Sequence, residues 1–236
     1  MEVIRCENLS KHFGNVVALD GLSLTIEKGA VFGFLGPNGA GKTTTLRLFA
    51  GLTHPTAGRV WVGGEEVSGN SLHLRSSIGY LPESPAFYGW MTGREFLCFT
   101  GGLYGLDGAA AKARAEEMLQ RVDLMEAADR RVKGYSRGMQ QRLGLAQALI
   151  NRPGILLLDE PASALDPMGR RDMLETIHSL KGETTVFIST HILADVERIC
   201  DRVAIINHGK LVTMGSLEEL RARRQRALFE IEFEED

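Results

Sequence analysis

The segment GPNGAGKTT, residues 36–44, decides the fold of this chain. It follows the apolar run AVFGFL and precedes TLRLFAGL, whose apolar residues recur at helical spacing. The order is strand, glycine-rich turn and helix, and the spacing GxxxxGK[ST] of a P-loop is met in full by Gly36, Gly41, Lys42 and Thr43. The sequence therefore predicts an α/β fold with a site for a nucleoside triphosphate.

Each residue type of this segment has its own task in phosphate binding. Glycines let backbone N–H groups turn toward phosphate oxygens, Lys42 reaches the terminal phosphates, and Thr43 offers its hydroxyl to Mg²⁺. ATP and Mg²⁺ are thus the expected cofactors. The residues expected to contact ATP here are Gly36, Pro37, Asn38, Gly39, Ala40, Gly41, Lys42, Thr43 and Thr44.

A second apolar run, ILLLDE, ends in the adjacent carboxylates Asp159 and Glu160. Because neighbouring residues of a strand point to opposite faces, the two are expected to have different tasks. Asp159 suits the metal ion, and Glu160 suits the general base that polarises the attacking water. Without the P-loop, the pair would be interpreted as solvated carboxylates at the end of a strand.

The stretch YSRGMQQRLGLAQALI, which begins at Tyr135, predicts a helix that starts near Ser136 and Gly138. The first N–H groups of a helix lack partners within it, so such a start is a natural anion site. An ordinary capped helix would have the same residues. The residues alone leave both interpretations open.

Composition restricts the class of protein. With 44% hydrophobic and 24% charged residues, the 236-residue chain is typical of a globular α/β domain. The net charge of -3 gives no basic field, so nucleic acid is not an expected partner. Three distant cysteines form no disulfide or metal pattern, which indicates a reducing compartment. We see neither a secretory signal nor an apolar run of about 20 residues, so any membrane contact is expected to be peripheral.

Strands and helices are both predicted along the chain. Strands are expected at Val3–Cys6, Val16–Ile26, Ala30–Leu35, Gly58–Val62, Ile78–Leu81, Ile155–Asp159, Thr184–Ser189 and Val203–Asn207. Helices are expected after Gly41, at Thr92–Gly105 and Ala109–Val122, and after Ser136, Asp166, His191 and Ser216. Only helices are expected at about 88–152. ALFEIEFEED, at the end, is either an edge strand or the start of a longer extension.

With GPNGAGKTT, YSRGM, ILLLDEP, SALD and STH in this order, residues 3–220 resemble the nucleotide-binding domain of ABC transporters. The resemblance implies one nucleotide-binding domain over 1–220. Residues 221–236 are expected to form a basic helix end and a strand, or the start of an extension. It also implies a RecA-like core with an antiparallel β subdomain and a helical subdomain at about 88–152. In that family each ATP lies between the P-loop of one domain and the signature helix of another, so a second ATP-binding subunit, identical or different, is implied.

The resemblance assigns roles to further residues. Phe13 matches an aromatic that stacks on adenine, and the alternative is an ordinary apolar strand residue. His191 matches the switch histidine that contacts the γ-phosphate, and Asp166 matches a segment that communicates between the two ATP sites. The signature segment that contacts the partner's ATP would be Ser136, Arg137, Gly138 and Met139.

Two departures from the family pattern stand out. Glu83 occupies a position where glutamine is usual; it either helps to hold Mg²⁺ or water, or is a surface acid. Tyr135, Arg137 and Met139 replace the leucine, first glycine and glutamine of the common signature LSGGQ. Arg137 either points to solvent or places positive charge near the γ-phosphate across the dimer.

GYLPE and RRVKGYSRGMQQRLGLAQAL are similar to the ATPases of ABC-2 type exporters, whose permeases are separate chains. This implies a peripheral subunit at the cytoplasmic face of the membrane that powers export of an unidentified substrate. The alternative is a soluble ABC ATPase acting on nucleic acid or ribosomes. Two further segments each allow two interpretations. SPAFYGWMTGREF either docks on the permease or packs internally, and RARRQR either touches lipid or is a solvated helix end.

Overall fold

The computed structural model describes residues 1–68 and 72–225. Its strands are β1 Glu2–Phe13, β2 Val16–Glu27, β3 Val31–Leu35, β4 Ala57–Val62, β5 Glu65–Glu66, β6 Ile78–Leu81, β7 Ile155–Asp159, β8 Thr185–Thr190, β9 Arg202–Asn207 and β10 Lys210–Ser216. Its α-helices are α1 Lys42–Phe49, α2 Leu72–Ser77, α3 Gly93–Leu103, α4 Gly108–Arg121, α5 Arg137–Leu149, α6 Pro167–His178, α7 Leu193–Ile199 and α8 Leu217–Gln225. All strands and helices predicted for this part of the chain are present, and β5, β10 and α2 are additional. The interpretations of ALFEIEFEED fall outside the described residues.

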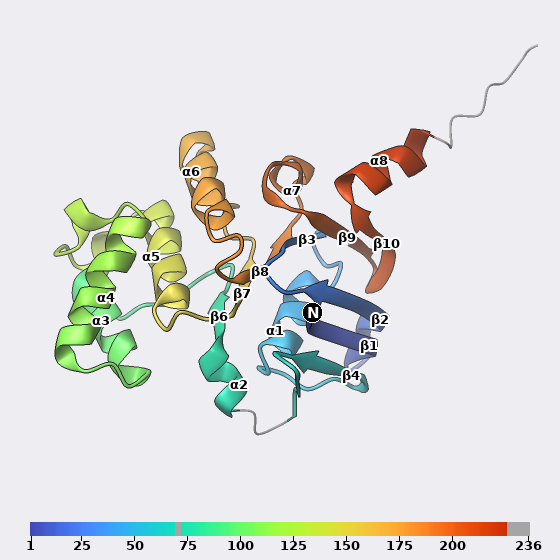
Figure 1. Ribbon diagram of the computed structural model, residues 1–236, viewed down its shortest axis with the longest axis horizontal. Coiled ribbons are helices and arrows are strands. Elements are labelled where there is room, and N and C mark those ends of the chain that lie inside the picture. The colour runs from blue at the N-terminus through green and yellow to red at the C-terminus, as the bar shows by residue number, and fades with distance from the viewer. Residues whose placement is uncertain (69–71, 226–236) are drawn as a thin grey trace, which may run out of the picture.

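The larger sheet has six strands in the order β10-β9-β3-β8-β7-β6, and all its pairs except β9 with β10 are parallel (Figure 1). Parallel strands need crossover connections, which here are largely helical and cover both faces of the sheet. Strands covered on both faces have no solvent side, and this explains their nearly unbroken apolar sequences. The predicted α/β architecture is therefore confirmed.

Alternate residues of the central strand β3 enter two different cores. Val31 belongs to the core shared with α5, α6 and α7, whereas Phe32 and Phe34 belong to the core around α1. In the second core the Phe187 ring has its centroid 5.8 Å from that of Phe32 and 5.4 Å from that of Phe49. Helix α1 is thereby fixed between the larger sheet and the N-terminal sheet, and its first turn is held at the carboxyl end of β3.

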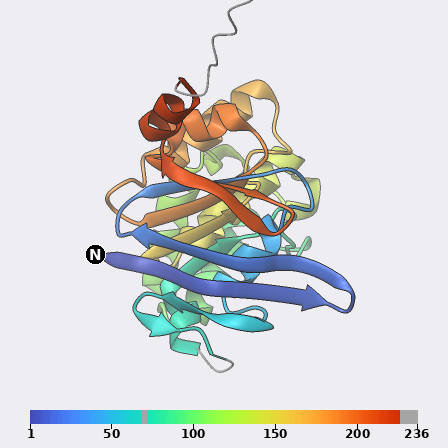
Figure 2. The same ribbon diagram turned by 90° about the vertical axis from the view of Figure 1, so that its right-hand side faces the viewer.

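The N-terminal sheet has the order β2-β1-β4-β5, and its long strands β1 and β2 run side by side in Figure 2. The prediction of a strand only at Val3–Cys6 was too short, because β1 continues to Phe13 through several register shifts. Asn8, with φ 47°, lies at one of these irregularities. Such bulges break the alternation of apolar and polar residues, so the pattern did not reveal the second half of the strand.

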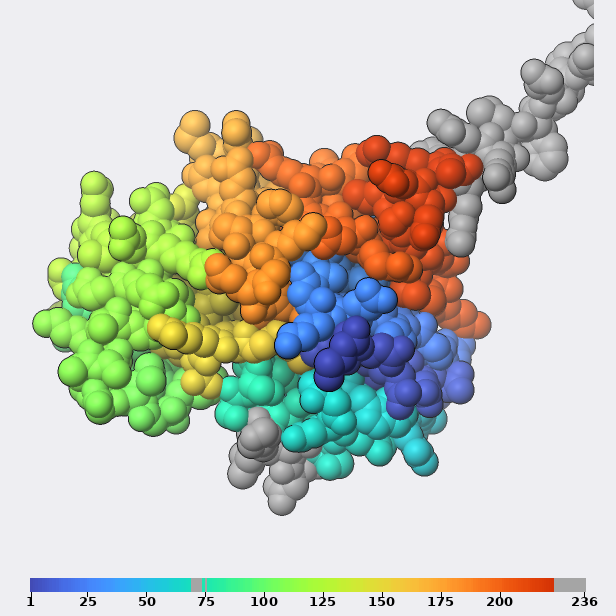
Figure 3. Space-filling view, in the orientation of Figure 1, coloured from blue at the N-terminus to red at the C-terminus, as the bar shows by residue number. Residues whose placement is uncertain are grey.

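Helices α3, α4 and α5 form a lobe at one end of the molecule, seen in green and yellow-green in Figure 3. Their starts are capped by Thr92, Asp107 and Ser136, respectively. Arg114 of α4 donates to the carbonyls of Leu149 and Ile150 at 2.6 and 3.0 Å, and so satisfies the end of α5. The apolar residues of the lobe belong to the same core as one face of the large sheet. The lobe is therefore anchored through a continuous core.

Within residues 1–68 and 72–225, no helix has the length and apolarity needed to cross a bilayer.

Cys6 and Cys200 are buried, and Cys98 is partly exposed. Burial is the main cause that raises the pKa of Cys6 and of Cys200 to about 12, and it also raises the pKa of Cys98. Because the thiolate is the reactive form, we expect Cys98 to react first with a thiol reagent at pH 8. Peptide mass spectrometry during labelling would check this order. Labelling of Cys6 or Cys200 ahead of Cys98 in the folded protein would contradict it.

Candidate functional site

The glycine-rich turn leads directly into α1. Gly41 is the residue before the helix, with φ 107°, and Lys42 is its first residue. The Lys42 side chain is only 6% exposed, and its ammonium group donates to the carbonyls of Gly36 at 2.7 Å and Pro37 at 3.1 Å. The glycine-rich turn therefore surrounds the Lys42 ammonium group, and the N-terminus of α1 lies at the same turn.

Gly41 tolerates no side chain. A Cβ there would lie 2.6 Å from the Ala18 carbonyl oxygen, and its φ lies in the region that favours glycine. We expect Gly41→Ala to lower the free energy of unfolding by about 1–3 kcal/mol and to weaken ATP binding. Urea denaturation would measure the first effect. Gly102→Ala is the control, because a Cβ at that position in α3 meets no atom within 4 Å; equal destabilisation by both would contradict the prediction.

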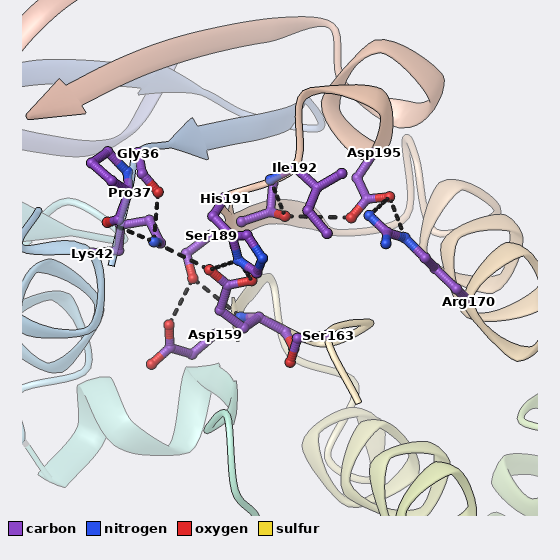
Figure 4. Close-up of polar contacts among 12 residues, drawn as sticks. Gly36, Pro37, Lys42, Asp159, Ser163, Arg170, Ser189, His191, Ile192 and Asp195 are labelled. Atoms are coloured by element: carbon purple, nitrogen blue, oxygen red, sulfur yellow. Dashed lines mark hydrogen bonds and ion pairs between the residues drawn. The ribbon is translucent and has the colours of Figure 1, made fainter. Parts of the chain in front are cut away.

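A cleft of about 410 Å³ lies beside this turn. It opens near the carboxyl ends of β3, β7 and β8, the edge where ligands bind in open α/β sheets. Figure 4 shows its polar contacts. The residues lining it are Val16, Val17, Ala18, Asn38, Gly39, Gly41, Lys42, Thr43, Thr44, Glu83, Glu160, Ser163 and His191.

Glu160 is buried at the centre of these contacts. Its carboxylate lies 3.2 Å from the Lys42 ammonium nitrogen and 3.0 to 3.1 Å from Nδ1 of His191 (Figure 4). The strand β7 ends at Asp159, and Glu160 has φ 49°. The expected strand alternation therefore does not explain where Glu160 points. Its backbone N–H instead donates to the carbonyl and hydroxyl oxygens of Ser189, each at 3.1 Å, and this holds the unusual turn.

Asp159 has a different environment. Its Oδ1 accepts a hydrogen bond from the Ser189 hydroxyl at 2.6 Å. Its Oδ2 is buried and has no hydrogen-bond partner among the described residues. Burial first, and the Asp159 charge second, raise the pKa of the nearby Tyr80 hydroxyl. A buried anionic oxygen without a donor is costly unless a cation approaches it, so Asp159 fits a metal ion.

Comparison with known proteins identifies the family. Residues 19–163 match the profile of the ABC transporter family. The uncharacterized ABC transporter ATP-binding protein YxlF of Bacillus subtilis is 45% identical over 99% of this chain and 77% of the relative. The chain belongs to the ABC transporter family.

Other members of the ABC transporter family match as well. The bacitracin transport ATP-binding protein BcrA of Bacillus licheniformis is 39% identical over 96% of this chain and 74% of the relative. The Nod factor export ATP-binding protein I of Burkholderia lata is 41% identical over 89% of this chain and 69% of the relative. A solved dimeric ATP-binding cassette in a post-hydrolysis state with ADP and Pi has TM-score 0.83 and 26% identity, covering 91% of this chain and 98% of that one.

These matches confirm the predicted ABC-type P-loop fold and the ATP ligand. As an ABC ATP-binding subunit the chain hydrolyses ATP, and such subunits dimerise and work with membrane permeases.

The segment Ser136 to Met139, which is expected to be the signature, lies at the start of α5. Ser136 precedes the helix, and its hydroxyl oxygen accepts from the N–H of Met139 at 3.2 Å. Arg137 is exposed, and Gly138 and Met139 are partly buried. Of the described residues, those lining the cleft do not include this segment. The chain therefore brings the P-loop and Glu160 together, but not with its own Ser136 segment.

Helix α5 is nevertheless tied to the cleft through Glu83. The Gln141 side chain is 3% exposed and donates to the Glu83 carbonyl at 2.6 Å. One turn later, a Cβ on Gly144 would lie 2.5 Å from Leu81 and 3.3 Å from Pro85. Glycine at this position is what lets the helix approach the Glu83 segment so closely.

Besides the Ser136 segment, six residues with expected roles do not line the cleft: Phe13, Gly36, Pro37, Ala40, Asp159 and Asp166. Phe13 is 51% exposed at the end of β1, with the Lys11 ammonium 4.9 Å from its ring centroid, and Val16 to Ala18 line the cleft instead. Asp166 caps α6, its Oδ1 accepting from the N–H of Gly169 at 3.1 Å. The structure thus gives Asp166 a local task, and its expected role between subunits stays a prediction.

Ser189, which hydrogen-bonds to both Asp159 and Glu160, was not among the residues expected at the site. Ser189 is the serine of the STH segment. A serine at the end of an apolar strand does not indicate that two carboxylates lie next to it in the fold. Ser163 was missed likewise; its hydroxyl donates to the Glu160 carbonyl at 3.0 Å.

Proposed function

We propose that this chain powers export through a separate ABC-2 type permease, and that two ATP-binding subunits close around two ATP molecules. The observation that carries this is the grouping of Lys42, Glu160 and His191 in one cleft, while the Ser136 segment is presented elsewhere. One chain then supplies two half-sites. Each half would be completed by the partner subunit, identical or different.

Within one cleft, Lys42 and His191 bind the terminal phosphates and Glu160 is the general base. The ammonium group of Lys42 exchanges its contact with Glu160 for phosphate oxygens. This exchange frees the carboxylate to accept a proton from the attacking water, while His191 stays within hydrogen-bond distance of Glu160. ATP binding and activation of the base are thus linked through one ion pair.

Asp159, Thr43 and Glu83 are the side chains proposed to hold Mg²⁺. Support comes from the unpartnered Oδ2 of Asp159 and from the places of Thr43 and Glu83 in the cleft lining. A bound Mg²⁺ would neutralise charge on the phosphates. The hydroxyl of Ser189 keeps the Asp159 carboxylate in a fixed orientation for that task.

The permease is proposed to dock beside α3. Phe87 and Met91 pack against the core, whereas Tyr88 and Trp90 are 51% and 66% exposed. The Tyr88 ring lies edge-on to Phe99, which is 40% exposed, with their centroids 5.7 Å apart. Exposed aromatic residues are typical of interface centres. Internal packing therefore applies to Phe87 and Met91, whereas docking on the permease is proposed for Tyr88 and Trp90.

Export and membrane location rest on the relatives. Two of them are named for bacitracin transport and Nod factor export. We propose the same kind of task here, at the cytoplasmic face of the membrane, with the cassette over 1–220 and its helical part near 88–152. The boundary at 220 falls inside α8. Arg221, in the basic run, pairs with Glu197 at 2.8 Å, which favours a solvated helix end over lipid contact.

Capture of the intact protein from its native membranes would test the export proposal. A photo-crosslinking residue replaces Trp90, and in a control sample it replaces Met125, an exposed residue outside the aromatic patch. We expect crosslinks to a polytopic membrane protein from position 90 only. Crosslinks from position 125 alone would move the docking surface, and capture of ribosomes or DNA would contradict the proposal.

A further inference from the structure

Arg170 and Asp195 form an ion pair beside the cleft that none of the roles above includes. The guanidinium of Arg170, in the first turn of α6, lies 2.6 to 2.7 Å from Oδ1 of Asp195, in the first turn of α7. Asp195 is only 6% exposed. A carboxylate this deeply buried needs its partner, because an uncompensated buried charge is strongly unfavourable.

The other carboxylate oxygen of Asp195 reaches the turn that carries His191. Oδ2 accepts from the Thr190 hydroxyl at 3.3 Å, and that hydroxyl oxygen accepts from the N–H of Ile192 at 3.1 Å (Figure 4). Thr190 and Ile192 flank His191 on both sides. Asp195 therefore fixes the backbone turn from which the His191 ring extends toward Glu160.

The other end of the ion pair reaches the start of α6. The backbone N–H of Arg170 donates to the carbonyl of Asp166 at 2.9 Å, in the first turn of the helix that Asp166 caps. Arg170 therefore belongs to the same rigid turn as Asp166. A continuous set of hydrogen bonds thus runs from Asp166 through Arg170 and Asp195 to the His191 turn.

We propose that the Arg170–Asp195 ion pair is a positioning device that holds the His191 turn against the start of α6. This inference rests on the proposed function, in which His191 contacts the terminal phosphate, and on the expectation that the Asp166 segment communicates between the two ATP sites. The ion pair couples the His191 turn to the start of α6, so the position of the His191 side chain depends on the position of α6. Neither residue of the pair is among those that line the cleft.

The structure offers a matched control for this pair. Arg198 of α7 lies 2.8 Å from Glu175 of α6, so it links the same two helices away from the His191 turn. Both of these residues are substantially exposed, at 41% and 52% of their side chains. Exposed pairs contribute little to stability. A variant of Arg198 therefore removes a bond between α6 and α7 without touching the positioning contact.

The test compares Asp195→Asn, Arg170→Gln, the double variant and Arg198→Gln in steady-state ATPase assays of the full chain. We expect kcat to fall about 10-fold or more in both single variants, since small misplacements of catalytic groups cost up to about 100-fold. KM and the Kd for a fluorescent ATP analogue should stay within about twofold, because Lys42 and the turn around it are untouched. The double variant should be hardly worse than either single one, because the two residues act as a unit.

Arg198→Gln is expected to keep kcat within about twofold. Equal losses in Arg198→Gln and Asp195→Asn would overturn the proposal, since any link between α6 and α7 would then suffice. Unchanged kcat in a folded Asp195→Asn protein would also overturn it. Should Asp195→Asn not fold, Arg170→Lys decides: it keeps the charge but loses the planar guanidinium fork, and unchanged kcat there overturns the proposal.

His191→Ala, measured in the same assays, separates this inference from the proposed function. If His191→Ala retains normal turnover, the proposed role of His191 is wrong. If His191→Ala loses turnover while Asp195→Asn and Arg170→Gln keep it, only the positioning role is wrong. Loss of kcat in all three, with intact ATP binding, supports both.

Discussion

Replacing Glu160 by glutamine is expected to lower the rate of ATP hydrolysis by about 10² to 10⁴, while ATP binding persists. Glutamine has nearly the same shape and keeps hydrogen-bonding capacity toward His191, but its amide does not accept the proton of an attacking water. It also carries no charge to hold Lys42, whose ammonium lies 3.2 Å from the Glu160 carboxylate. The lysine is then released to phosphate oxygens, so affinity for ATP should not fall.

Phosphate release and equilibrium binding of an ATP analogue would measure these two effects separately. Glu175→Gln makes the same chemical change at an exposed position on α6 and should leave both unchanged. Near-normal turnover in Glu160→Gln would remove Glu160 from the role of general base. Loss of binding together with turnover would indicate that its main task is to organise Lys42.

Two inactive variants are expected to restore each other's activity when mixed. Lys42→Ala disables the P-loop half of the site, and Gly138→Asp places an anion where the signature helix should meet phosphate. Each alone should lose about 10²-fold or more of the ATPase activity. In a mixed dimer, one site combines both defects, and the other combines an intact P-loop with an intact signature. Random mixing yields half mixed dimers with one working site each, or about a quarter of wild-type activity if the sites are independent.

ATPase activity across a series of mixing ratios would check this restoration. A negative charge near a helix N-terminus is favourable. A Cβ at Gly138 would lie 3.0 Å from the end of the Leu165 side chain, which has to shift by a few tenths of an ångström to accept the aspartate. A mixture with no more activity than the sum of its parts would refute a composite site. Full activity of either variant alone would also do so.

Much of the fold was predictable because its signals are local. The P-loop residues stand in one continuous segment, and the strands β3, β7 and β8 are apolar runs covered on both faces. The strand β10 was not predicted, because its residues are mostly half-exposed and its sequence KLVTMGS has only a weak alternation. Its place depends on pairing with β9, which is a tertiary contact.

The site was predictable where a motif names the residue and not where side chains from distant segments meet. Lys42, Glu160 and His191 were each expected at the site, but their mutual ion pair and hydrogen bonds follow from the meeting of β3, β7 and β8 at one edge. The left-handed backbone of Glu160 had no sequence signal, since such residues are usually glycine or asparagine. The pairing of Arg170 with Asp195 joins residues 25 positions apart, at a separation for which no local rule exists.

Gly144 and Gln141 pack closely against the Glu83 segment, so this contact is the point about which helix α5 would tilt. Gln141 lies five residues from Ser136, or about 7.5 Å along the axis of α5. A tilt of about 10° around this point would displace the Ser136 end by about 1.3 Å at that rise per residue. Such a displacement is comparable to the tolerance of a phosphate-binding geometry. In the proposed dimer, the position of the Ser136 end relative to the neighbour's nucleotide would therefore depend on how the Glu83 segment lies in the same subunit.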